Sequence, residues 1–177
     1  MSAPVDYATI QKALYTWLYT GLGGLPVSWA FQKRAQNDRE LGYGVLTILS
    51  VGMPPDLVQD EARQATVGEE IYLQLVGTRR LVLNAQCVTN SQLPTQSAIA
   101  LLSQAQATLR DNGNLDAAGI TFISDSPITN LSAVVAEGFE SRASIDITFD
   151  VVSDFTSATP TGWFNQAVIN GNQIGPP

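Results

Sequence analysis

Histidine is absent from this 177-residue chain, lysine occurs only as Lys12 and Lys33, and the only cysteine is Cys87. The lack of histidine excludes Ser-His-Asp and Cys-His nucleophile systems and imidazole metal sites. A single cysteine excludes an internal disulfide bond, and its place in an alternating apolar pattern predicts a buried small hydrophobe. A Ser-Lys dyad would need a buried lysine, and the sequence around Lys12 and Lys33 does not indicate one. We therefore expect a protein that is not an enzyme.

Charge is also scarce, since Asp, Glu, Lys and Arg make up only 14% of the residues. The 16 acidic residues outnumber the 9 basic ones, which gives a net charge of −7. An acidic chain is poorly suited to neutralising the phosphates of DNA, so we expect nearby DNA to pass without being bound. A low-charge surface on a chain that is 45% hydrophobic favours burial against other subunits, with a sparingly charged monomer as the alternative.

Signals for membranes and cofactors are missing too. No segment approaches the roughly 20 apolar residues that span a bilayer, and the N-terminus lacks the features of a signal peptide, so we expect folding in a cytoplasm and no membrane partner. Gly21-Leu-Gly-Gly follows a predicted helix and lacks the Lys-Ser/Thr of a phosphate loop. Asp111 to Asp116 does not have calcium-loop spacing and is interpreted as a helix-ending turn. We expect no cofactor and no metal.

The clearest pattern that is present is strict alternation from Gly138 to Val152. A period of two residues is typical of a strand with one buried and one wet face. The predicted core face consists of Ala143, Ile145, Ile147, Phe149 and Val151. The predicted wet, acidic face consists of Arg142, Ser144, Asp146, Thr148 and Asp150.

Two segments have the apolar spacing of helices. Residues 6–20 predict a helix capped by Asp6, with an apolar stripe that includes Leu14 and Trp17. A second helix is predicted after a Ser97 cap, with a narrow stripe running to Leu109 and Asn112-Gly113 closing it.

Further strands are predicted on both sides of the second helix. Gly77-Thr78 resembles a tight type II′ turn between two alternating runs, which predicts a hairpin. Residues 54–68 are polar and without a period, so we expect a long mobile loop. The other predicted strands are Val27 to Phe31, Tyr43 to Met53, Gly119 to Ser124, and Trp163 to Ile169 before a turn at Asn170-Gly171.

These elements predict an α+β fold, a mostly antiparallel sheet with two main helices packed on one face. The length suits one compact domain, which we place at residues 1–156. Residues 157–177 would then form a C-terminal strand and tail.

Two pairs of charged residues are the candidate contacts with other subunits or with DNA. Arg79 and Arg80 are expected at the hairpin tip, where they would meet a neighbour's carboxylates or DNA, or simply blunt a sheet edge. Asp146 and Asp150 would repel DNA if their strand face lined a channel, or form an ordinary wet face. A carboxylate pair four residues apart on a strand is separated by about 13 Å, beyond the roughly 5–9.5 Å of glycoside hydrolases.

The order of these features resembles the neck and tail terminator family of tailed bacteriophages over roughly residues 5–155. Phe139-Glu-Ser-Arg-Ala143, which leads into the alternating strand, is the most distinctive segment. The other matching segments are Trp29-Ala-Phe31, Gly42-Tyr-Gly-Val-Leu-Thr-Ile-Leu, Leu115-Asp-Ala-Ala-Gly-Ile120 and Ser126-Pro-Ile-Thr-Asn-Leu131.

The resemblance implies a virion protein without catalysis that forms a ring, typically a hexamer. It implies that the ring caps the tail tube and binds the tail tube protein and a head-tail connector or neck protein, with DNA only passing through. Another connector or tube protein of the same virion, a small-ligand binding module and a carboxylate-dependent hydrolase remain as alternatives.

Overall fold

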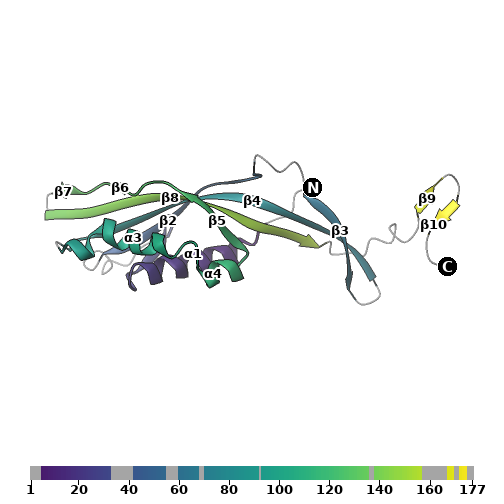
Figure 1. Cartoon of the computed structure of the whole chain (residues 1–177), viewed down its shortest axis with the longest axis horizontal. Helices are drawn as coiled ribbons and strands as arrows, with labels where there is room; N and C mark the ends of the chain where they lie inside the picture. Colours follow the sequence, from purple (N-terminus) through teal and green to yellow (C-terminus); the bar gives the residue numbers. More distant parts are fainter. Residues whose placement is uncertain are drawn as a thin grey trace.

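The computed structural model describes residues 5–32, 42–54, 60–67, 70–91, 93–135, 138–156, 167–169 and 172–174. A sheet runs in the order β1-β2-β4-β8-β5, and the helices formed by the described residues lie on one side of it (Figure 1). Strands β3, β6 and β7 pair along β4 or β8 off this path. The pairings are antiparallel except for β1 with β2. The predicted α+β class is confirmed.

Two long strands form the centre of the sheet. Strand β4 (Glu70–Thr89) and strand β8 (Gly138–Thr156) pair without interruption from Gln74↔Thr156 to Thr89↔Ser141. The predicted hairpin at Gly77-Thr78 is therefore wrong, since both residues lie inside β4. The prediction failed because β8 is long enough to pair with Gly77 and with its neighbours on both sides. The alternation of buried and open positions along β4 also continues through Gly77 without a shift.

The hairpin that does form joins β3 (Glu61–Val67) to the start of β4. Its register runs from Val67↔Glu70 to Glu61↔Val76. Residues 61–67 were expected within a long loop, and that prediction is wrong; residues 55–59 and 68 lie outside the described structure. Strand β3 is mostly exposed and so lacks the apolar alternation that marks a half-buried strand. We call residues 61–67 and 70–76 the arm, and it extends past the end of the helical layer (Figure 1).

Helix α1 (Tyr7–Gly21) begins as predicted, because the Asp6 carboxylate accepts from the backbone N–H of Ala8 and Thr9 at 3.1 and 3.2 Å. Helix α3 (Ala98–Ala107) is capped by Ser97, whose Oγ accepts from Ala100 N at 3.3 Å. These are the two main helices that the sequence predicts.

The end of α3 differs from the prediction. The helix stops at Ala107, and Asn112 instead caps a short additional helix, α4 (Gly113–Ala117). The Asn112 side chain accepts from the N–H groups of Asn114 and Leu115, so Asn112-Gly113 begins a helix where the sequence had indicated an end. The short side chain of asparagine suits both roles, and the local pattern alone does not choose between them.

The core lies between the helices and the sheet face beneath them. The alternating face of β8, from Ala143 to Val151, is buried as predicted. Trp17 is the largest side chain there, and its Nε1 donates to the carbonyl of Ala105 at 3.1 Å, which ties α1 to α3. Cys87 is fully buried, also as predicted, and desolvation raises the pKa of its thiol to about 12.

The remaining strands lie at the edges. Strand β1 (Val27–Trp29) runs parallel to β2 (Tyr43–Gly52), and β5 (Ile120–Asp125) forms the opposite edge. Strands β6 (Thr129–Asn130) and β7 (Ala133–Val135) extend that edge along β8, and a 3-10 turn (Pro94–Gln96) precedes α3. Strands β9 (Ala167–Ile169) and β10 (Asn172–Ile174) pair with each other. Of the predicted last strand only Ala167–Ile169 is described, and the predicted turn at residues 170–171 is not.

Candidate functional site

The four candidate contact residues lie in the middle of the long ladder of β4 and β8. Arg79 and Arg80 are consecutive on β4 and therefore point to opposite faces of the sheet. Neither residue is at a hairpin tip, so their predicted position is wrong. Asp146 and Asp150 share one face of β8, and Arg80 lies directly opposite Asp150 in the register. The structure thus brings Arg80 and Asp150 together and separates both from Arg79.

Arg79 forms a buried, two-pronged ion pair with Asp60, the residue before β3. Its Nη1 and Nη2 each lie 2.6 Å from one carboxylate oxygen, and the two side chains are only 6% and 4% exposed. The hydrogen bond to Asp60 raises the pKa of Arg79 above its ordinary value. Planar two-point pairing of this kind is among the strongest polar contacts in proteins. The pair holds the base of the arm against the middle of β4.

The sheet face opposite the helices carries no helix among the described residues, and we call it the open face. Arg80 Nε and Nη2 donate to the two oxygens of Asp150 at 3.0 and 3.2 Å. Asn84 Nδ2 lies 2.6 Å from Asp146 Oδ1 and 2.8 Å from Ser144 Oγ. Because Arg80 compensates Asp150, this face is less acidic than the sequence of β8 alone indicates.

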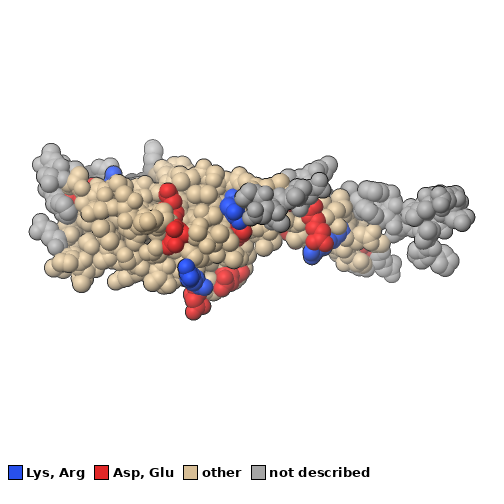
Figure 2. Space-filling view, turned by 45° about the horizontal axis from the view of Figure 1, so that its top comes forward, with Lys and Arg blue, Asp and Glu red and all other residues tan. Residues whose placement is uncertain are grey.

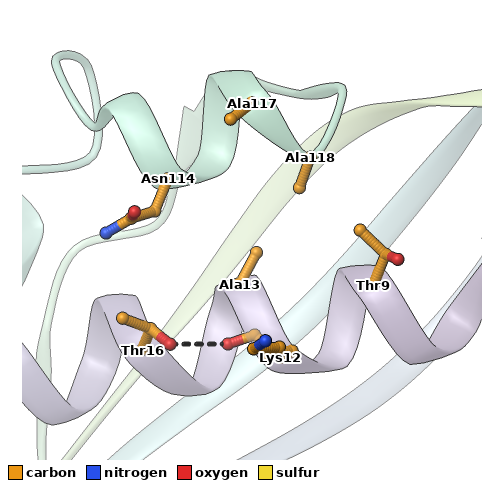
Figure 3. A pocket seen from close by; sticks show the side chains of 7 residues that line it. All are labelled: Thr9, Lys12, Ala13, Thr16, Asn114, Ala117 and Ala118. Atoms are coloured by element: carbon orange, nitrogen blue, oxygen red, sulfur yellow. Dashed lines mark hydrogen bonds between the residues drawn. The ribbon is translucent and has the colours of Figure 1, made fainter.

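A groove between α1 and α4 is a feature that the sequence did not predict, because α4 itself was not predicted. It has a volume of about 210 Å³. Figure 3 shows Ala13 pointing from α1 toward Ala118, which points back from the end of α4. The lining consists of Thr9, Lys12, Ala13, Thr16, Asn114, Ala117 and Ala118.

Lys12 differs from most of the other described cations. Arg63, Arg79, Arg80 and Arg142 each lie within 4 Å of a carboxylate, and Arg110 stacks over the ring of Phe122 at 5.5 Å. Lys12 is exposed and has no ion pair with any residue in the described ranges. On the face shown in Figure 2, large areas carry no charged side chain, and blue side chains lie beside red ones.

Metal-binding clusters and membrane-spanning helices are absent from the described residues. These residues contain no group of three or more Cys, Asp or Glu side chains placed to hold a metal ion. None of the helices formed by these residues has the length and apolar character needed to cross a bilayer.

Comparison with known proteins gives one family and several similar structures. The family model described as phage neck terminator protein matches residues 8–175. No curated protein resembles the chain in sequence.

Two solved structures share the fold at low identity. One is a sheath/tube terminator of an extracellular contractile injection system, termed PVC, in its extended state, with 13% identity, a TM-score of 0.50, and coverage of 91% of this chain and 61% of that one. The other is the tube-terminating cap of the anti-feeding prophage, with 14% identity, a TM-score of 0.52, and coverage of 94% and 57%. The chain thus spans about three fifths of the length of these two proteins.

Proposed function

Because the chain belongs to the phage neck terminator protein family, we propose that six copies close into a ring that caps the tail tube and joins it to the head. The family assignment makes the chain a virion structural protein with a tail-terminating role. The ring, its subunit number and its partners, a tail tube protein and a head-tail connector or neck protein, are the proposed part.

The observation that carries the ring is the presence of two different surfaces that the described residues of the chain leave uncovered. The arm extends beyond the helical layer at one end (Figure 1). The α1–α4 groove lies on the body. Contacts between unlike surfaces are head-to-tail, and such contacts generate rings when the rotation closes. The low charge of the chain supports burial of much of its surface between subunits.

The open face is the surface that suits a DNA channel. Asp150 is compensated by Arg80, and the amide of Asn84 binds Asp146 and Ser144. A wall of mutually satisfied polar groups offers a phosphate backbone few unpaired cations, and cation contacts with phosphate are what hold DNA to proteins. Arg80, Asp146 and Asp150 therefore belong to the channel wall in this proposal, whereas Arg79 holds the arm.

The remaining parts of the proposal concern organisation and location. Residues 1–156 form the terminator domain, and residues 157–177 supply a C-terminal strand and tail. The family is one of structural proteins, so this chain contributes binding surfaces and no catalysis. The ring assembles in the host cytoplasm and remains in the neck of the virion.

Negative-stain electron microscopy of the purified protein, alone and mixed with its tail tubes, tests the proposal. We expect closed rings and tube ends that carry an added ring of density. Solitary particles that leave tube ends bare at every protein concentration contradict it. Long tubes built by this protein alone would identify it as a tube protein, which is the alternative within the same virion.

A further inference from the structure

The arm ends in a two-stranded tip that has little support from the rest of the described residues. Pairing between β8 and β4 stops at Thr156↔Gln74. From Glu70 to Tyr72, the strand paired with β4 among the described residues is β3. An isolated two-stranded hairpin is marginally stable in water, so this tip gains from a partner.

One face of the arm is acidic. Register places Glu70, Tyr72, Gln74 and Val76 on this face of β4, which continues the open face of the body. Glu61 and Asp154 lie on neighbouring strands of the same face, and Arg63 is the only described cation there. The Tyr72 hydroxyl donates to Glu70 Oε2 at 2.7 Å, so the tip presents an aromatic ring and a carboxylate side by side.

The α1–α4 groove has the complementary properties. Its walls include the small side chains of Ala13, Ala117 and Ala118. Its volume of about 210 Å³ exceeds the roughly 150 Å³ that admits a benzene ring in an engineered protein cavity. Lys12, which like Arg110 has no carboxylate partner among the described residues, is one of the residues that line it (Figure 3).

We propose that the arm of one copy docks on the body of the next copy, with the Tyr72 ring in the α1–α4 groove and the Glu70 carboxylate paired with the Lys12 ammonium. This rests on the proposed ring and names the surfaces that close it. Tyrosine is enriched among the residues that dominate binding energy at protein interfaces. A charge pair at the edge of such a contact fixes how the two surfaces align and disfavours wrong partners. A nucleic acid does not suit the acidic tip, and a second copy supplies the required cation in a chain that has few.

A charge swap tests the pairing. Lys12→Glu alone and Glu70→Lys alone should each raise the protein concentration needed to form rings or cap tail tubes by roughly tenfold, about the effect of 1.4 kcal/mol. The double variant, with both changes, should recover most of that loss. Failure of the double variant to improve on the single variants overturns the pairing.

Disulfide trapping tests the proximity directly, because Cys87 is buried and does not compete. A chain carrying Lys12→Cys and Glu70→Cys, mixed with tail tubes and mildly oxidised, should give a ladder of linked multimers, as a head-to-tail contact requires. The control carries Thr20→Cys with Glu70→Cys, because residue 20 lies about 12 Å further along α1. An equal ladder in the control, or dimers only, contradicts the inference.

The two proposals fail in distinguishable ways. Capped tubes without a ladder reject this contact and leave the tail-capping ring intact. Absence of both capped tubes and rings in the unaltered protein rejects the ring and this contact together.

Discussion

Arg79 and Asp60 are joined by two hydrogen bonds of 2.6 Å although neither side chain is more than 6% exposed. The contact connects the middle of β4 to the residue that precedes β3. Because it lies at the base of the arm, it sets where the arm leaves the body.

Asp60→Asn should lower the free energy of unfolding by about 3 kcal/mol, since it leaves the Arg79 cation buried without its counter-ion. Urea denaturation followed by circular dichroism measures the loss. The neighbouring variant Glu61→Gln is the matched control, because the Glu61–Arg63 pair is exposed and should contribute nothing measurable. Equal stability of the Asp60→Asn variant and the unaltered protein would show that the buried pair does not hold the arm.

Gly77→Ala should disrupt the same contact by steric means. A Cβ at position 77 would lie 2.0 Å from Asp60 Oδ1, so the carboxylate must move away from Arg79. We expect a loss of about 2 kcal/mol in unfolding free energy, within the range for overpacked sites. Gly52→Ala in β2 is the control, because nothing lies within 4 Å of its added Cβ. Similar effects of the two substitutions would contradict this account.

Asp6→Ala should lower the midpoint of thermal unfolding, whereas Asp6→Asn should preserve most of it because asparagine also caps helices well. The Thr9 hydroxyl donates to Asp6 at 2.7 Å and is the main cause of the lowered pKa of this carboxyl. A lowered folded pKa means that the stabilisation by the charged cap is present above the ordinary value of 3.8 and is lost as pH falls through the folded value. The loss in unfolding midpoint caused by Asp6→Ala should therefore be smaller in acid. Calorimetry at pH 7 and pH 2.5 measures it, and an equal loss at both pH values would show that the charge is irrelevant.

Cys87 should not react with a thiol reagent at pH 8 until the protein unfolds. Burial raises the pKa of this thiol to about 12 from an ordinary 9.0, and only the thiolate is a good nucleophile. Because the folded pKa is raised, the stabilising contribution of the neutral thiol is complete below about 9 and is lost between pH 9 and 12. Colorimetric thiol titration with and without urea checks this, and fast labelling of the native protein would contradict the burial.

Thr148→Arg should slow the release of DNA from assembled virions if the open face lines the channel. Thr148 lies between Asp146 and Asp150 on that face of β8, so an arginine there adds one positive charge to the face that meets the phosphates. Thr148→Gln adds bulk without charge and is the control. Timed DNA release from virions carrying each variant measures the effect, and identical rates would remove the open face from the channel wall.

The sequence predicted those elements whose patterns are local. Alternation from Ala143 to Val151 identified the buried face of β8, and the caps Asp6 and Ser97 identified the starts of two helices. Each of these features depends on residues a few positions apart, so no knowledge of the rest of the chain is required.

The arm could not be predicted in the same way. Strand β3 is polar on both faces because both are largely exposed, and its strand form depends on pairing with β4. Gly77-Thr78 has the residues of a tight turn, and only the partner strand β8 decides that β4 continues through them. The pair of Arg79 with Asp60 joins positions 19 residues apart, so the spacing of charges along the chain did not reveal it.

The uninterrupted ladder between β4 and β8 limits the insertions and deletions that this gene can tolerate. Sixteen consecutive residue pairs hold the two strands in one register, from Gln74↔Thr156 to Thr89↔Ser141. Deleting a single codon within β4 would turn Leu81 and Leu83 to the opposite side for part of the strand. Related phages should therefore differ here by substitution, or by insertions in multiples of two residues, while single-residue length changes concentrate in the connecting segments.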